Sequence, residues 1–332
     1  MRIFLTGING FLGSHIAKQL NSAGHEVVGL VRNDFRKKML SNIPIEYCVG
    51  DLIDEDSYKE YIKSCEVVIH AAAITQFEAF DKKNTFLINT DSTKKLLKNS
   101  FQSGIKRFIY ISTRGTLGVS NPPSSSSEKS GYKNKKYMDT YLLSKFFAEK
   151  EVKSFSSQQN KMKCIILSPT AMIGTHDDRP SPIGKILLDF CKGKIKFYTS
   201  GGINIVDVKQ VASACVNALE KGKNGESYII GNINISLYNL FKEISLIQSV
   251  KLPRIKLPFY LTYIASFFIE LYSRIFRMNP FTTRSKVISL YNYHSYCTSI
   301  KSLMELEVKN IEFSKTLNET IKWICVNNKI DN

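Results

Sequence analysis

Residues 6–13 read TGINGFLG and directly follow an apolar run, Arg2–Thr6. A strand, a glycine-rich turn and a helix in this order form the setting in which such glycines hold phosphate groups. Gly7 permits the tight turn, Gly10 lets the backbone approach a pyrophosphate, and Gly13 allows close packing of helix on strand. The helix N-terminus adds unpaired N–H groups and a positive dipole end. The stretch predicts a dinucleotide site contacted by Gly7, Asn9, Gly10, Phe11, Leu12 and Gly13.

The pattern around this loop continues through about residue 175. Further apolar runs at 26–31, 46–49, 67–69, 107–111 and 163–167 alternate with helical stretches, the longest at about 82–103. Strands that are apolar throughout and separated by helices are typical of a parallel sheet buried on both faces. We expect an α/β protein with a doubly wound Rossmann domain over residues 1–175. Residues 176–332 are expected to form a smaller, mainly helical substrate domain, with chain crossings back to the first.

Composition narrows the class of protein. The chain has 332 residues, a net charge of +17 and 43% hydrophobic residues. Its basic residues are scattered and fit no nucleic-acid-binding motif, so no nucleic-acid partner is expected. Seven widely spaced cysteines without a CxxC pair indicate free buried thiols, and no spacing supports a metal site. No signal peptide and no long apolar span are found, so a cytoplasmic location is the expectation.

The motif at residues 6–13, with its GxxGxxG spacing, resembles the extended short-chain dehydrogenase/reductase family, and the resemblance covers nearly the whole chain. Within that family the chain is most similar to the dihydroflavonol 4-reductase-like and 3β-hydroxysteroid dehydrogenase-like branches. The resemblance implies an NAD(P)-dependent enzyme acting on a small molecule, and it suggests a homodimer. It also assigns cofactor contacts to Asp51 and Leu52, to the turn at Ala71, Ala72 and Ala73, and to Pro169.

The end of the second strand bears on the choice of cofactor. NAD-binding folds usually place an acid there to bind the ribose hydroxyls. This chain has Arg32 in that region, and a guanidinium suits the 2′-phosphate of NADP. We therefore favour NADP, with Arg36 as a helper. NAD remains the alternative, because Asp34 lies close by and Arg32 could be a surface charge.

Tyr141 and Lys145 form a YxxxK motif, and residues four apart share one face of a helix. In this arrangement both residues reach the nicotinamide ribose, and Lys145 lowers the pKa of Tyr141. The phenol then exchanges a proton with a carbonyl or alcohol oxygen while hydride moves. By resemblance, Thr113 is the catalytic hydroxyl, with Ser112 as the fallback, and Asn89 braces the active-site strands.

Two segments bear on the substrate. Arg114 and Gly115 stand where sugar dehydratases usually carry an acidic pair, and Ser168 stands where epimerases often carry an asparagine. Both departures favour a reductase or dehydrogenase, with a nucleotide-sugar epimerase holding NAD, or a non-catalytic binding protein, as alternatives. The polar loop 118–136 is either a lid or a surface insertion.

The aromatic stretch 257–278 has one acid, Glu270, and its bases gather at its end. Such a helix fits peripheral membrane contact, a cover over an apolar substrate, or a subunit contact.

Overall fold

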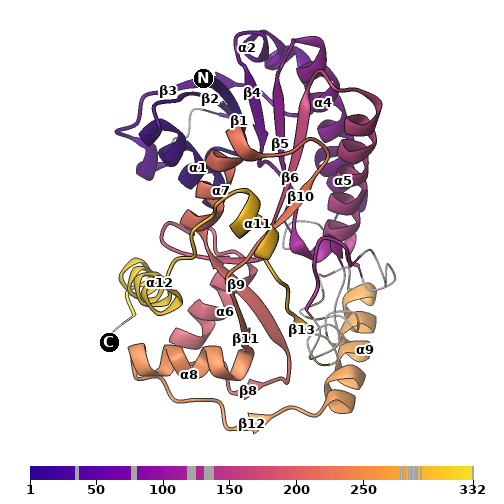
Figure 1. Cartoon of the computed structure of the whole chain (residues 1–332). Helices are drawn as coiled ribbons and strands as arrows, with labels where there is room; N and C mark the ends of the chain where they lie inside the picture. Colours follow the sequence, from indigo (N-terminus) through magenta and orange to yellow (C-terminus); the bar gives the residue numbers. More distant parts are fainter. Residues whose placement is uncertain are drawn as a thin grey trace.

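The structure is a computed structural model that describes residues 1–33, 37–75, 81–117, 125–130, 138–276 and 294–330, with 278, 280, 282, 284, 287 and 291 (Figure 1). Within these residues no helix is both long and apolar enough to cross a bilayer. Asp34, Arg36 and most of the loop 118–136 lie outside the described residues.

The main sheet has seven parallel strands in the order β10-β6-β5-β4-β1-β2-β3. The strands are β1 (Arg2–Thr6), β2 (Glu26–Val31), β3 (Ile45–Val49), β4 (Val67–His70), β5 (Arg107–Ile111), β6 (Lys163–Pro169) and β10 (Ser227–Ile230). The chain runs outward from β1 to β3 and then restarts beside β1 at β4. Ligands of open α/β sheets bind at such a switch point, outside the carboxyl ends of the strands.

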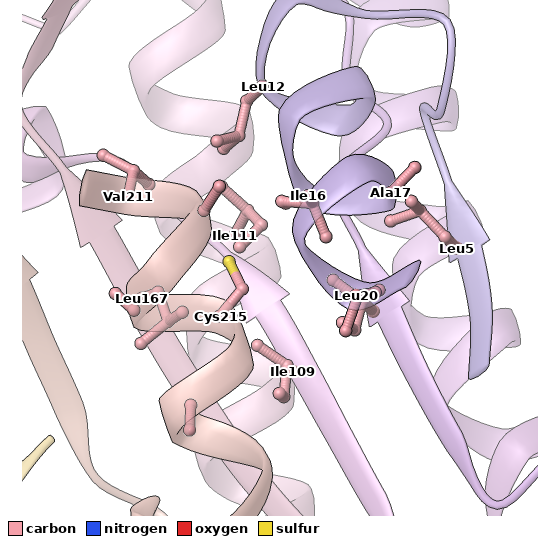
Figure 2. Close-up of a cluster of buried hydrophobic side chains, with 14 of the residues drawn as sticks. Leu5, Leu12, Ile16, Ala17, Leu20, Ile109, Ile111, Leu167, Val211 and Cys215 are labelled. Carbon is pink, nitrogen blue, oxygen red and sulfur yellow. The ribbon is translucent and has the colours of Figure 1, made fainter. Parts of the chain in front are cut away.

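Helices cover both faces of this sheet, as the apolar strands predict. On one face α1 (Phe11–Ser22) packs beside α7 (Val208–Lys221), and on the other lie α2 (Lys59–Lys63), α4 (Ser92–Gln102) and α5 (Thr140–Gln158). Figure 2 shows Ile16 and Leu20 of α1 meeting Cys215 of α7 above β5. The expected doubly wound α/β fold is confirmed.

The helical stretch before β5 is interrupted by a wider turn. It consists of α3 (Lys82–Phe86), a π-helical turn over Leu87–Asp91, and α4. Such turns are rare and are found frequently at functional sites. This one brings Asn89 and Thr90 into hydrogen bonds with Ser144 of α5.

The remaining elements form a second layer of structure below the carboxyl edge of the main sheet (Figure 1). A four-stranded sheet contains β7 (Ala171–Ile173), β9 (Gly202–Asp207), β11 (Ile233–Ser236) and β13 (His294–Ser295), and β8 (Phe197–Tyr198) pairs with β12 (Ile255–Lys256). The helices here are α6 (Pro182–Cys191), α8 (Leu237–Gln248), α9 (Phe259–Ile275), α11 (Ile300–Glu305) and α12 (Phe313–Asn328). Strands this short leave little periodicity in a sequence, which explains why a mainly helical region was expected.

Two elements beyond residue 175 belong to the main sheet rather than to this second layer. Strand β10 pairs with β6, and α7 covers the same face as α1, where Gln19 Nε2 donates to the carbonyl of Lys209 at 2.7 Å. Residues 1–175 therefore contain most of the Rossmann sheet but not its last strand. All seven cysteines are buried free thiols, as expected.

Candidate active site

The glycine loop forms a bare cradle at the start of α1. Gly7 has a φ of 74°, and a Cβ built on it would lie 2.7 Å from the amide nitrogen of Ala72. Gly10 is the N-cap of α1, no side chain caps this helix, and its first turn carries no acid. The free N–H groups therefore remain for an anion. These features fit the pyrophosphate of a dinucleotide, which Gly7, Gly10 and the start of α1 would hold.

Gly13 allows the glycine loop to pack closely against α1, because a Cβ at this position would lie 2.0 Å from the carbonyl oxygen of Gly7. We expect Gly13→Ala to displace the loop, to lower the melting temperature, and to weaken NADPH binding at least about tenfold. Calorimetric titration and thermal unfolding measure both effects. Gly24→Ala is the control: its φ of 77° is strained, but its Cβ meets open space. It should cost about 1–2 kcal/mol of stability and leave cofactor affinity intact. Unchanged affinity in Gly13→Ala would refute the role assigned to this glycine.

The other predicted cofactor residues come to the carboxyl edge of neighbouring strands. Arg32 is exposed at the end of β2, whereas Asp51 and Leu52 follow β3. Asp51 is exposed, and its carboxylate accepts from the amide of Ile53 at 3.0 Å. The turn 71–73 follows β4, and buried Pro169 ends β6. On the helix side, Phe11 and Leu12 begin α1, and Asn9 Oδ1 accepts from the amide of Lys37 at 3.3 Å.

A buried histidine ties the turn after β4 to the neighbouring helix. The His70 ring nitrogens lie 2.7 Å from Thr6 Oγ1 and 2.9 Å from Thr93 Oγ1. Thr6 Oγ1 also accepts from the amide of Ala72, and Thr93 Oγ1 donates to the carbonyl of Asn89. Because the Thr93 hydroxyl donates to Asn89, His70 Nε2 must carry a proton and donate it to Thr93 Oγ1. Burial and the nearby charge of Lys145 lower the pKa of His70 to about 3, so the ring is neutral at physiological pH and Nδ1 accepts from Thr6.

Helix α5, which carries the predicted catalytic pair, is capped by Asp139, whose side chain accepts from the amide of Leu142 at 2.9 Å. This cap sets Tyr141 in the first turn. Burial is the main effect on the pKa of Tyr141, and together with the smaller effect of the Asp139 carboxylate it raises this pKa to about 12. A hydrogen bond between the Tyr141 and Thr113 side chains lowers the pKa but is outweighed.

Lys145 lies one turn further along α5 and is almost fully buried. Its ammonium donates to the carbonyl of Ile111 at 2.5 Å and stands 4.1 Å from the centre of the Tyr110 ring. Burial lowers the pKa of Lys145 to about 7, against the opposing effect of Glu149. The expectation that Lys145 lowers the pKa of Tyr141 is thus wrong for the protein alone, because burial disfavours the charged form of both groups.

Glu149 was not singled out in the sequence, although it lies four residues after Lys145 on the same face of α5. This buried carboxylate accepts from Ser112 Oγ at 2.7 Å and from Thr116 Oγ1 at 3.0 Å. Lys153 pairs with its other oxygen at 2.7 Å. Because the Ser112 hydroxyl is directed to Glu149, Thr113 is the hydroxyl that remains beside Tyr141.

Asn89 acts on the site indirectly. Its amide exchanges two hydrogen bonds with the backbone of Ile74, at 2.7 and 3.0 Å, and donates to Ser144 Oγ at 2.9 Å. It therefore holds the segment after β4 against α5, and the structure gives it no contact with Tyr141 or Lys145. In this geometry Asn89 is a positioning residue.

Arg114 follows Thr113 but turns away from the phenol. Its buried guanidinium donates to Ser126 Oγ at 3.0 Å and to the carbonyl of Tyr296 at 2.9 Å. The residue thereby ties the end of β5 to the segment that precedes α11. A cavity of about 280 Å³ lies elsewhere, between α6 and α12, and residues such as Asp177, Leu187 and Trp323 line it. None of the predicted catalytic residues contributes to its wall.

The doubly wound sheet and the glycine loop at its switch point are typical of proteins that bind a nicotinamide dinucleotide. A family model described as the NAD dependent epimerase/dehydratase family matches residues 3–231. The chain belongs to this family, the extended short-chain dehydrogenases/reductases, whose typical cofactor is NAD or NADP.

Relatives of this chain include reductases and dehydrogenases at low identity. The chain is 28% identical over 324 residues to a putative dihydroflavonol 4-reductase of Synechocystis sp., covering 96% of this chain and 93% of that protein. It is 28% identical over 232 residues to a sterol-4-alpha-carboxylate 3-dehydrogenase (decarboxylating) of Dictyostelium discoideum, covering 68% and 70%. The crystal structure of gox2253 superimposes with a TM-score of 0.88 at 30% identity and covers 99% of both chains.

Proposed function

We propose that this protein is an NADP-dependent reductase or dehydrogenase that transfers hydride between the nicotinamide and a carbonyl/alcohol pair. The observation that carries the proposal is the half-buried Tyr141 phenol, hydrogen-bonded to Thr113 one helical turn from buried Lys145. These are the parts that a proton exchange at a carbonyl oxygen needs: an acid, a group that orients the substrate, and a cation.

The bound cofactor supplies the hydride, and the chain itself manages the proton. Thr113 orients the substrate oxygen toward Tyr141, and the phenol donates its proton as the oxygen gains charge. With its pKa raised to about 12, the Tyr141 phenol is protonated at neutral pH and so has a proton to donate. Lys145, with a pKa of about 7, exchanges a proton readily near physiological pH.

An apolar carbonyl compound is the substrate class that we propose. Two relatives carry names that refer to a dihydroflavonol reductase and a sterol-carboxylate dehydrogenase, both of which are named for largely apolar compounds. Ser168 and Arg114 depart from the residues that sugar-nucleotide enzymes usually carry at these positions. The alternative within the same family is a nucleotide-sugar epimerase that retains NAD.

Cofactor preference separates these alternatives and tests Arg32. We expect purified protein to bind NADPH more tightly than NADH, and Arg32→Ala to weaken NADPH binding about 10–100-fold without affecting NADH. The reason is the loss of charge-assisted hydrogen bonds to the 2′-phosphate. Fluorescence titration measures both affinities, and Arg254→Ala, at another exposed arginine, is the control. Retained NAD in the absorbance spectrum of the purified protein, with no NADPH preference, would refute the role of Arg32 and favour the epimerase.

A further inference from the structure

Helix α9 presents its apolar side chains outward. Six residues within it are more than half exposed: Tyr260, Leu261, Ile264, Phe268, Tyr272 and Ile275. Their spacing of one, three and four residues places them on one continuous face of the helix. In Figure 1, α9 stands at the periphery of the molecule, below α5. Seventeen residues give this face a length of about 25 Å.

Three polar residues of α9, Thr262, Ser266 and Glu270, face the protein instead. Thr262 Oγ1 lies 2.6 Å from the Tyr291 hydroxyl, and Ser266 is fully buried. Glu270, the only acid of the helix, accepts from the amide and the Nε of Arg284 at 2.6 and 2.9 Å. The helix is therefore inverted relative to an ordinary surface helix, whose apolar face packs on the core.

An exposed apolar face of this size is unusual for a soluble monomer and marks an interaction site. Its surroundings are basic: Lys251, Arg254 and Lys256 are exposed on the segment that leads into α9, and the chain carries a net charge of +17. The apolar face carries no carboxylate, because Glu270 is turned inward and paired.

We propose that α9 lies in the interfacial layer of a bilayer that contains anionic phospholipids. The outward face enters the acyl boundary, Tyr260 and Tyr272 stand at headgroup level, and the three cations contact lipid phosphates. A second copy of the chain is a poorer occupant. Pairing two α9 helices would bring two +17 chains and two basic rims together, whereas an anionic membrane complements both the apolar face and the charge.

The segment after α9 links this surface to the catalytic residues. Tyr291 contacts Thr262 of α9, β13 pairs with β9, and the carbonyl of Tyr296 accepts from Arg114, which adjoins Thr113. These contacts thus connect α9 with the residue that follows Thr113. The membrane contact itself does not rest on the proposed function.

Vesicle sedimentation tests the contact with the full chain. We expect wild-type protein to sediment with vesicles of phosphatidylcholine and phosphatidylglycerol, and much less with phosphatidylcholine alone. Ile264→Asp combined with Phe268→Asp should reduce the affinity about 100-fold, since two apolar side chains no longer enter the bilayer. Arg254→Ala combined with Lys256→Ala should reduce it about 25-fold on the anionic vesicles, at roughly fivefold for each cation.

Leu246→Asp on α8 is the matched control, because Leu246 is also exposed but lies outside this surface. Its binding should equal that of the wild type, and unchanged melting temperatures for all variants would show that the fold is intact. Wild-type protein that stays in the supernatant with both vesicle types overturns the proposal. The proposal is also overturned if the wild-type protein binds no vesicles but forms a dimer in light scattering, and if Ile264→Asp with Phe268→Asp dissociates that dimer. Failure of carbonyl turnover would instead count against the proposed function, since sedimentation needs no substrate.

Discussion

Replacing Tyr141 with phenylalanine should reduce kcat for carbonyl reduction by about 10³-fold while the affinity for NADPH stays within about twofold of the wild type. The substitution removes only the hydroxyl that is hydrogen-bonded to Thr113. A positioned general acid contributes about 10²–10⁴-fold to such a reaction. Steady-state NADPH oxidation with a carbonyl substrate measures the first quantity, and fluorescence titration measures the second.

Tyr58→Phe provides the control for this change. Tyr58 loses the same hydroxyl, but it lies fully buried beside Phe4 on the α2 face of the sheet and is not one of the predicted catalytic residues. Its kcat should match the wild type. If Tyr141→Phe keeps wild-type turnover, another group supplies the proton and the assignment of Tyr141 fails.

Replacing Lys145 with methionine should abolish turnover and yet stabilise the fold. Burial lowers the pKa of Lys145 from 10.5 to about 7, so the folded protein binds fewer protons than the unfolded chain between these pH values. Burial of the charged Lys145 therefore lowers the free energy of unfolding by its full amount below about pH 7. This penalty disappears as the pH rises toward 10.5. Methionine removes the penalty, although it also removes the bond to Ile111 and the contact with Tyr110. We expect a net gain of about 2 kcal/mol at pH 7.

Thermal unfolding at pH 7 and at pH 10 measures the effect, and the gain should shrink at the higher pH. Lys150→Met is the control, since Lys150 is exposed on the same helix and should show neither the stabilisation nor the loss of turnover. A Lys145→Met protein that is less stable than the wild type at pH 7 would mean that the contacts of the ammonium outweigh its desolvation.

The parts of the fold that local signals determine could be predicted from the sequence. The loop 6–13 lies between its own strand and helix, and the first six strands of the main sheet are short apolar runs. The fold class is confirmed and so is the family. These features depend on residues that lie close together along the chain.

The parts that depend on distant partners could not be predicted. Strand β10 reads as an isolated apolar run, and only its pairing with β6 makes it the last strand of the main sheet. The two hydrogen bonds of the His70 ring are made with Thr6 and Thr93, which lie 64 and 23 residues from His70 along the chain. Glu149 is the one missed residue with a local signal, an acid one turn after Lys145. The raised pKa of Tyr141 reflects burial, which spacing along a helix does not reveal.

The interleaved path of the chain limits how such a protein can exchange parts with its relatives. If recombination replaced the chain after residue 175 with that of a relative, α1 would pack on a foreign α7 and β6 would pair with a foreign β10. The hydrogen bond from Gln19 to the carbonyl of Lys209 would then join residues of different origin. The two ends of the chain must therefore change together at these interfaces. New substrate preferences are easier to acquire by substitutions in the loops below the sheet than by acquiring a whole foreign C-terminal half.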